Sequence, residues 1–347
     1  MMTGSSIETR GPQAPPARAG RYRHVDREIL GLLTALAALA AAAAAFAPNF
    51  ATTGNILDVL RQVAFTSIIA YGMTLVIVSG EIDVSVGSAI AFTSALFGVL
   101  VTAWHLPVWL AATGVVALAT AIGGCAGAVR ACFNVPSFIV TLAMFSALRG
   151  AAMLLTDAIP IPILDEGFEV WGGGSLLGVP IPALIMLLVF ALFGVLATRT
   201  AFGRSVYAIG GNAEAAHLSG IPVKRIRTVL FAITGGLAAV SGLLMTSRLG
   251  SGNSNIGFGV EFAVITAVIV GGASLSGGKG SMVGTLLGGL FIGVLNNAMV
   301  LIGINSYAQE VANGVVVLLA VLVRMMLARD AARRRRSVNP SRKTPKI

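Results

Sequence analysis

Charged residues are scarce in this sequence. Asp, Glu, Lys and Arg make up 11% of the 347 residues, whereas hydrophobic residues make up 56%. A water-soluble domain of this size could not cover so much apolar side chain. Aromatic residues are also few, at 7%, while glycine occurs 42 times, a balance that favours close helix contacts in lipid over an aromatic-rich soluble core. The composition therefore predicts an integral membrane protein.

Cysteine and histidine are scarcer still. Cys125 and Cys132 are the two cysteines, and their apolar surroundings predict reduced packing residues rather than a disulfide framework or a metal site. The three histidines, His24, His105 and His217, do not combine with serine and acid in any arrangement that suggests hydrolysis. We therefore expect no catalytic residue, no metal and no cofactor in this chain.

Residues 1–29 have no apolar core followed by a small-residue cleavage site, so they do not read as a signal peptide. Their Arg, Pro, Ala and Gly predict a disordered basic cytoplasmic tail. A second basic tail is predicted at residues 328–347, where the run Arg333 to Arg336 would fix topology and contact anionic membrane lipid. We prefer this interpretation to nucleic-acid binding.

Residues 30–327 are predicted to form one all-α, polytopic transmembrane domain of about ten helices. A helix needs roughly 20 apolar residues to cross the hydrocarbon. A short apolar stretch at about 261–276 ends in glycines and serines, so a full span and a re-entrant half-helix are both open. The other spans are expected at about 30–47, 62–79, 87–104, 108–129, 136–155, 179–198, 228–247, 281–302 and 308–327.

The basic residues predict the orientation of these spans. With ten spans and both termini in the cytoplasm, every Lys and Arg except Arg61, Arg149 and Arg248 falls on the cytoplasmic side. Arg149 is expected to snorkel to the outer leaflet. The loop at 156–178 then lies outside, with four acidic and no basic residues, and predicts an acidic external face.

Polar residues within apolar sequence are candidates for a translocation pathway. Glu81, Asp83 and Ser85 belong to the segment GEIDVSVGS at 80–88. Carboxylates buried at membrane depth would mark a pathway or gate, whereas in a hairpin turn Asp83 and Ser85 would cap the next helix, and both alternatives are open. The further candidates are Ser137, Thr141, Asn296 and Asn297, with contact between helices favoured over solute contact for the two asparagines.

A glycine-rich segment at 271–281 does not qualify as a phosphate-binding loop. The pattern G-x-x-x-x-G-K-[ST] requires glycine at Ala273 and a hydroxyl residue at Gly280. Nucleotide binding by this chain is therefore rejected.

The longest polar interruption, residues 199–227, contains a short helix-forming segment. Asn212 is suited to the N-cap, Glu214 to the first turn and Gly220 to a left-handed C-cap. A helix this short is marginal in water, so it would need a docking partner or neighbouring loops. Docking and a capped linker on the membrane surface are both open.

These residues resemble a known family. The pattern Glu214-Ala215-Ala216-x-x-x-Gly220 is similar to the coupling-helix motif of ABC importer permeases, and the longer string 207–223 resembles the ribose and xylose class. Residues 80–88, 134–150 and 271–297 match the same class in the same order. Glu81 departs from it, because the class commonly has glycine there.

The resemblance implies a type II-like ABC importer permease in the bacterial plasma (inner) membrane. It implies a homodimer, a cytoplasmic ABC ATPase subunit that holds ATP and Mg and docks on the 199–227 loop, and a periplasmic or extracellular solute-binding protein. The solute would be a small polar molecule, most plausibly a monosaccharide. The alternative is an ion-coupled secondary transporter that uses Glu81 and Asp83.

Overall fold

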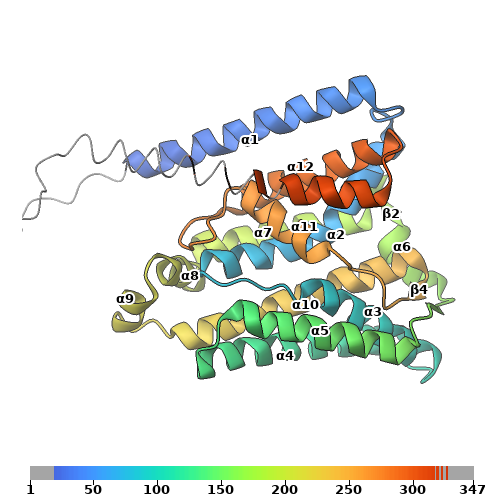
Figure 1. The fold of residues 1–347 in the computed structure, drawn as a ribbon. Helices are drawn as coiled ribbons and strands as arrows, with labels where there is room; N and C mark the ends of the chain where they lie inside the picture. Colours follow the sequence, from blue (N-terminus) through green and yellow to red (C-terminus); the bar gives the residue numbers. More distant parts are fainter. Residues whose placement is uncertain (1–18, 317, 320–321, 323–325, 327–347) are drawn as a thin grey trace, which may run out of the picture.

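The computed structural model describes residues 19–316, 318–319, 322 and 326. Its long helices run alongside one another between two ends (Figure 1). We call these the α9 end, which holds α8 (Ala201–Gly211) and α9 (Ala213–Leu218), and the α6 end, which holds α6 (Glu166–Gly173). Most of both predicted tails lies outside the described residues, and α1 (Ala19–Phe46) begins within the segment predicted as the first tail.

The all-α, polytopic fold is confirmed. Within the described residues, seven helices are long and apolar enough to cross a membrane: α1, α2 (Thr53–Val78), α4 (Val108–Phe133), α5 (Ser137–Thr156), α7 (Ile181–Arg199), α10 (Val223–Leu249) and α12 (Met282–Leu301). Two apolar helices are shorter, α3 (Val86–Thr102) and α11 (Val260–Val270). A further helix begins at residue 306. These elements correspond to the nine predicted spans and to the short apolar stretch at about 261–276.

Short antiparallel strand pairs accompany α6 at its end of the bundle. Strand β1 (Ile161–Pro162) pairs with β4 (Ser251–Gly252), and β2 (Ser175–Leu176) pairs with β3 (Val179–Pro180). In the first pair Ile161 lies opposite Gly252. The pairing ties the α5–α6 connection to the segment that follows α10.

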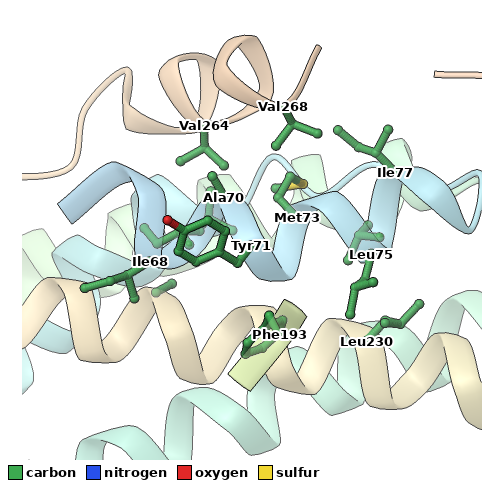
Figure 2. Packing of buried hydrophobic residues seen from close by; sticks show 14 of the residues in the cluster. Ile68, Ala70, Tyr71, Met73, Leu75, Ile77, Phe193, Leu230, Val264 and Val268 are labelled. Atoms are coloured by element: carbon green, nitrogen blue, oxygen red, sulfur yellow. The ribbon is translucent and has the colours of Figure 1, made fainter. Parts of the chain in front are cut away.

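Helix α2 is the centre of the core. Its side chains from Val63 to Val78 are almost all buried, around the whole circumference of the helix. Figure 2 shows Tyr71, Met73 and Leu75 between residues of α10 and α11, including Leu230 and Val264. A helix that is apolar on every side and buried on every side is a central helix.

Helices α4 and α10 pack through small residues. A Cβ added to Gly123 would overlap the Phe231 carbonyl oxygen, and one added to Gly127 would lie 2.8 Å from the Thr228 Cα. Such close backbone contact is how helices gain packing energy in lipid. Cys125 and Cys132 are unpaired but exposed on α4, so the expectation that they pack internally is wrong. Small residues occupy the contact face instead.

The stretch at 261–276 was expected to form either a full span or a half-helix, and the structure shows the shorter form, helix α11. Its eleven residues rise about 16 Å, roughly half the hydrocarbon thickness. It follows an irregular segment at 253–259 and begins against the start of α3, where a Cβ on Gly87 would lie 2.5 Å from the Gly257 carbonyl oxygen. Helix α3 in turn follows the buried, irregular segment 79–85. The irregular segment 253–259 therefore meets the start of α3, directly after the irregular segment 79–85.

We predict that Gly123→Val destabilises the protein by about 1–3 kcal/mol, because the new side chain forces α4 and α10 apart. Gly114→Val is the matched control, since no atom lies within 4 Å of a Cβ at Gly114 on the same helix. Thermal unfolding of the detergent-solubilised protein measures both. Equal melting temperatures for the two variants would contradict the packing role of Gly123.

Candidate functional site

The short helix α9 has the caps that the sequence predicts. The Asn212 side chain accepts a hydrogen bond from Ala215 N–H at 3.0 Å, and Gly220 has φ +83° beyond the helix. Glu214 and Ala215 are exposed, whereas Ala216 is buried against the rest of the chain. Helix α9 therefore presents one face to its surroundings at the end of the bundle (Figure 1).

Helix α8 anchors α9 to the core. Gly210 packs so closely on the end of α2 that a Cβ there would overlap the Val78 carbonyl oxygen, which accepts a hydrogen bond from Gly278 N–H at 2.8 Å. Tyr207 donates its hydroxyl to the Gly280 carbonyl at 2.8 Å, and burial raises the pKa of this phenol, so it stays protonated. We call this contact of α8 with Val78 and residues 277–280 the α8 seam.

Glu81 is a buried carboxylate with two cationic partners. Its Oε1 accepts a hydrogen bond from Arg130 Nε at 2.9 Å. Arg227 Nε lies 2.8 Å from the same oxygen, although its N–H is not aligned for a hydrogen bond. Only 3% of Glu81 is exposed, so an unpaired charge here would be costly. The pairing joins segment 79–85 to the end of α4 and the start of α10.

The rest of segment 79–85 is bound by neighbouring side chains. Asp83 Oδ1 accepts hydrogen bonds from Ser85 N–H at 2.9 Å and Ser85 Oγ at 2.6 Å. Ser137 Oγ, at the start of α5, accepts Ile82 N–H at 3.2 Å. The segment is therefore a buried connection within the protein, and of the two alternatives the hairpin turn is not what the structure shows. One feature of the turn is present, since Asp83 accepts the Ser85 N–H just before α3. Asp83 and Ser85 also line a narrow pocket between α3, α4, α5 and α10.

The other predicted pathway residues divide between two places. Thr141 is buried on α5, one turn beyond Ser137. Asn297 exchanges amide hydrogen bonds with Asn55 in both directions, at 2.9 and 2.8 Å, so it joins α12 to the start of α2. Asn296 Oδ1 is buried without a partner in the described part of the chain. The asparagines thus lie at the opposite end of α2 from Glu81.

Arg149 does not snorkel as expected. Its Nη1 donates to the carbonyls of Ser254 and Ile256, at 2.8 and 3.0 Å, and so holds the irregular segment before α11. Glu261 lies nearby in the first turn of α11, 2% exposed, with its Oε2 facing the place where Gly87 lacks a Cβ. The sequence analysis did not select Glu261, because a single acidic residue at the start of an apolar run looks like the polar end of a span.

Other residues of this region also escaped the sequence analysis. Arg130 and Arg227 were counted only as topology signals, yet both bind Glu81. Leu218 on α9 is 79% exposed, so α9 presents an apolar side chain at this end of the bundle as well as Glu214. Gly210 could have been noticed as part of the pair Gly210-Gly211, but its close approach to Val78 depends on the tertiary fold.

Irregular backbone inside a bundle of spans, here with a capped helix at one end, is typical of membrane transport proteins. Residues 55–326 match the family model described as branched-chain amino acid transport system / permease component. The chain belongs to this permease family.

Curated relatives cover nearly the whole chain. It is 47% identical to the probable ABC transporter permease protein YphD of Escherichia coli K12, over 90% of this chain and 94% of that protein. It is 44% identical to the ribose import permease protein RbsC of Haemophilus influenzae, over 87% and 94% of the two chains. It is 35% identical to the L-arabinose transport system permease protein AraH of E. coli K12, over 92% and 96%. The predicted ABC permease class is thereby confirmed.

We expect Gly210→Ala to loosen the α8 seam, because its methyl group would overlap the Val78 carbonyl oxygen. Gly211→Ala is the control, since the space beside Gly211 is open. Limited trypsin digestion after the exposed Arg204 should be several-fold faster in Gly210→Ala than in the parent or in Gly211→Ala. Identical digestion of all three proteins would show that the seam does not hold α8.

Proposed function

We propose that this chain is the membrane-spanning subunit of an ATP-driven importer and forms the translocation pathway for a monosaccharide. The observation that carries the proposal is helix α9, capped, exposed and fixed to the core by the α8 seam. ATP and Mg belong to a separate ABC ATPase subunit, which docks on α9. This chain then has no enzymatic step of its own.

The remaining partners follow from the two ends of the bundle. The α9 end faces the cytoplasm in this proposal, together with both termini, and the membrane is the bacterial inner membrane. A solute-binding protein docks on the α6 end, where Asp165, Glu166 and Glu169 lie within or beside α6. Two copies of the chain form the transporter. The names of the ribose and arabinose relatives support a sugar as the solute.

The pocket beside Asp83 and Ser85 is part of the proposed pathway. It lies between four spans and combines polar groups with apolar walls that include Phe92 and Met144. Ser137 and Thr141 are buried on α5, the helix that also contributes Met144 and Leu148 to the pocket wall. An ATP-driven change in residues 199–227, which we call the α9 loop, would open this region to one side of the membrane and then to the other.

The ion-coupled alternative is not favoured. That alternative assigns the proton or sodium site to Glu81 and Asp83, so it needs one of these two carboxylates to be free to bind the ion. Glu81 forms ion pairs with Arg130 and Arg227. Asp83 Oδ1 accepts two hydrogen bonds from Ser85. The curated relatives are named as ABC importer permeases rather than as ion-coupled transporters.

Asn212→Ala should uncouple transport, because loss of the N-cap weakens α9 by about 1 kcal/mol, which is large for a six-residue helix. Asn212→Asp is the matched control, since aspartate caps equally well. Leu218→Ser should weaken docking without unfolding the exposed helix. The measurement is ATP-dependent sugar uptake by vesicles that contain the chain, its ATPase and the binding protein. Uptake that is equal in all variants would refute docking through α9.

The sugar assignment is tested by competition. In the same vesicles we expect unlabelled ribose, arabinose or xylose to reduce uptake of a labelled pentose at least tenfold at saturation, whereas leucine leaves it unchanged. Leucine is the informative competitor because the family is named after branched-chain amino acid transport, whereas relatives such as the ribose permease are named after sugars. Leucine uptake without any sugar uptake would overturn the monosaccharide assignment.

A further inference from the structure

Glu81 joins three parts of the chain, its own turn and two helices, through one oxygen atom. Arg130 comes from the end of α4, Arg227 from the start of α10, and Glu81 itself from the turn after α2. The carboxylate is 3% exposed, while the two arginine side chains are 15% and 16% exposed. The cluster therefore lies at the edge of the core and is largely shielded from solvent.

The charges of this cluster do not balance. Two guanidinium groups share one carboxylate, so the arginines repel each other wherever Glu81 does not lie between them. A buried ion pair contributes little net stability, because desolvation offsets the attraction between the charges. What the cluster does provide is a defined position of α4 and α10 relative to segment 79–85. That position lasts only as long as the carboxylate is charged and in place.

The α9 loop is bound to the turn 78–81 at two points. Before α9, Gly210 packs on Val78 in the α8 seam. After α9, Arg227 contacts Glu81. Because both attachments converge on the same turn, displacement of the loop acts directly on that turn.

The same turn leads to the pathway pocket. Ile82 N–H is held by Ser137 on α5, and Asp83 and Ser85 line the pocket between α3, α4, α5 and α10. Arg130 adds a connection from Glu81 to α4, whose side chains Ala119 and Ala126 also line the pocket. A displacement of Arg227 would therefore act, through Glu81, on segment 79–85 and on α4, both of which line the pocket.

We propose that Glu81 is the positioning residue that transmits movement of the α9 loop to segment 79–85 and to α4. This inference rests on the proposed function, since it assumes that an ATPase moves α9. Glu81 contacts neither the ATPase nor the solute in this scheme. Its loss should therefore separate ATP hydrolysis from transport rather than abolish ATP hydrolysis.

The test uses the full importer in vesicles and measures sugar transported per ATP hydrolysed. In Glu81→Gln, which keeps the shape and removes the charge, we expect this ratio to fall at least tenfold while basal ATP hydrolysis stays within about twofold of the parent. Asp58→Asn is the matched control, because it removes the acid of an ion pair with Arg61 at the other end of α2. Its ratio should not change.

Arg227→Gln provides a second, milder variant that leaves Glu81 paired with Arg130. It should lower the same ratio, and the double variant Glu81→Gln with Arg227→Gln should be no worse than Glu81→Gln alone. A melting temperature and co-purification with the ATPase establish that each variant is folded and assembled. If Glu81→Gln does not fold, the ratio measured for Arg227→Gln decides the question.

Two results would overturn the inference. One is an unchanged ratio in both folded single variants. The other is a double variant whose defect equals the product of the two single defects, since the residues would then act independently. Absence of ATP-driven uptake by the parent protein is a different outcome, because it contradicts the proposed function itself.

Discussion

The structure depends on the need to satisfy every backbone polar group inside the membrane without water. Helices meet this need internally, but the irregular segments 79–85 and 253–259 cannot. Protein side chains supply the missing partners. Ser137 and Asp83 accept N–H groups of the first segment, and Arg149 donates to two carbonyls of the second. Several polar residues in this apolar chain therefore form hydrogen bonds with the backbone of the irregular segments.

Close approach of these segments explains the glycines that matter most. Gly87 and Gly257 let the starts of α3 and α11 meet, and Gly257 adopts φ +74°, which other residues rarely tolerate. Gly210 and Gly277 perform the same task at the α8 seam. Because backbone contacts of this kind have no flexible side chain to yield, they transmit displacement as rigid connections.

The sequence predicted what is local and missed what is tertiary. Span positions followed from apolar run length, and the caps of α9 followed from Asn212 and Gly220, because both depend on neighbouring residues alone. The partners of Glu81 did not follow, since Arg130 and Arg227 are distant in the chain and resembled ordinary topology signals. For the segment before the 87–104 span, the sequence left burial at membrane depth and a hairpin turn as two open alternatives. No hydropathy pattern distinguishes that segment from a turn.

Glu81 is the acid that keeps two arginines of different helices together. A glycine in place of Glu81 would leave Arg130 and Arg227 facing each other without an acid. Glu81 supplies that acid, and through Arg227 it attaches the α9 loop to the turn 78–81 at a second point. The α8 seam is a backbone contact that holds its shape, whereas the ion pair depends on charge and distance. A loop held rigidly at one point and electrostatically at the other can pivot about the seam. In the coupling proposed above, such a pivot would move Arg227 relative to Glu81, and the ion pair would carry rotation of α9 to the proposed pathway.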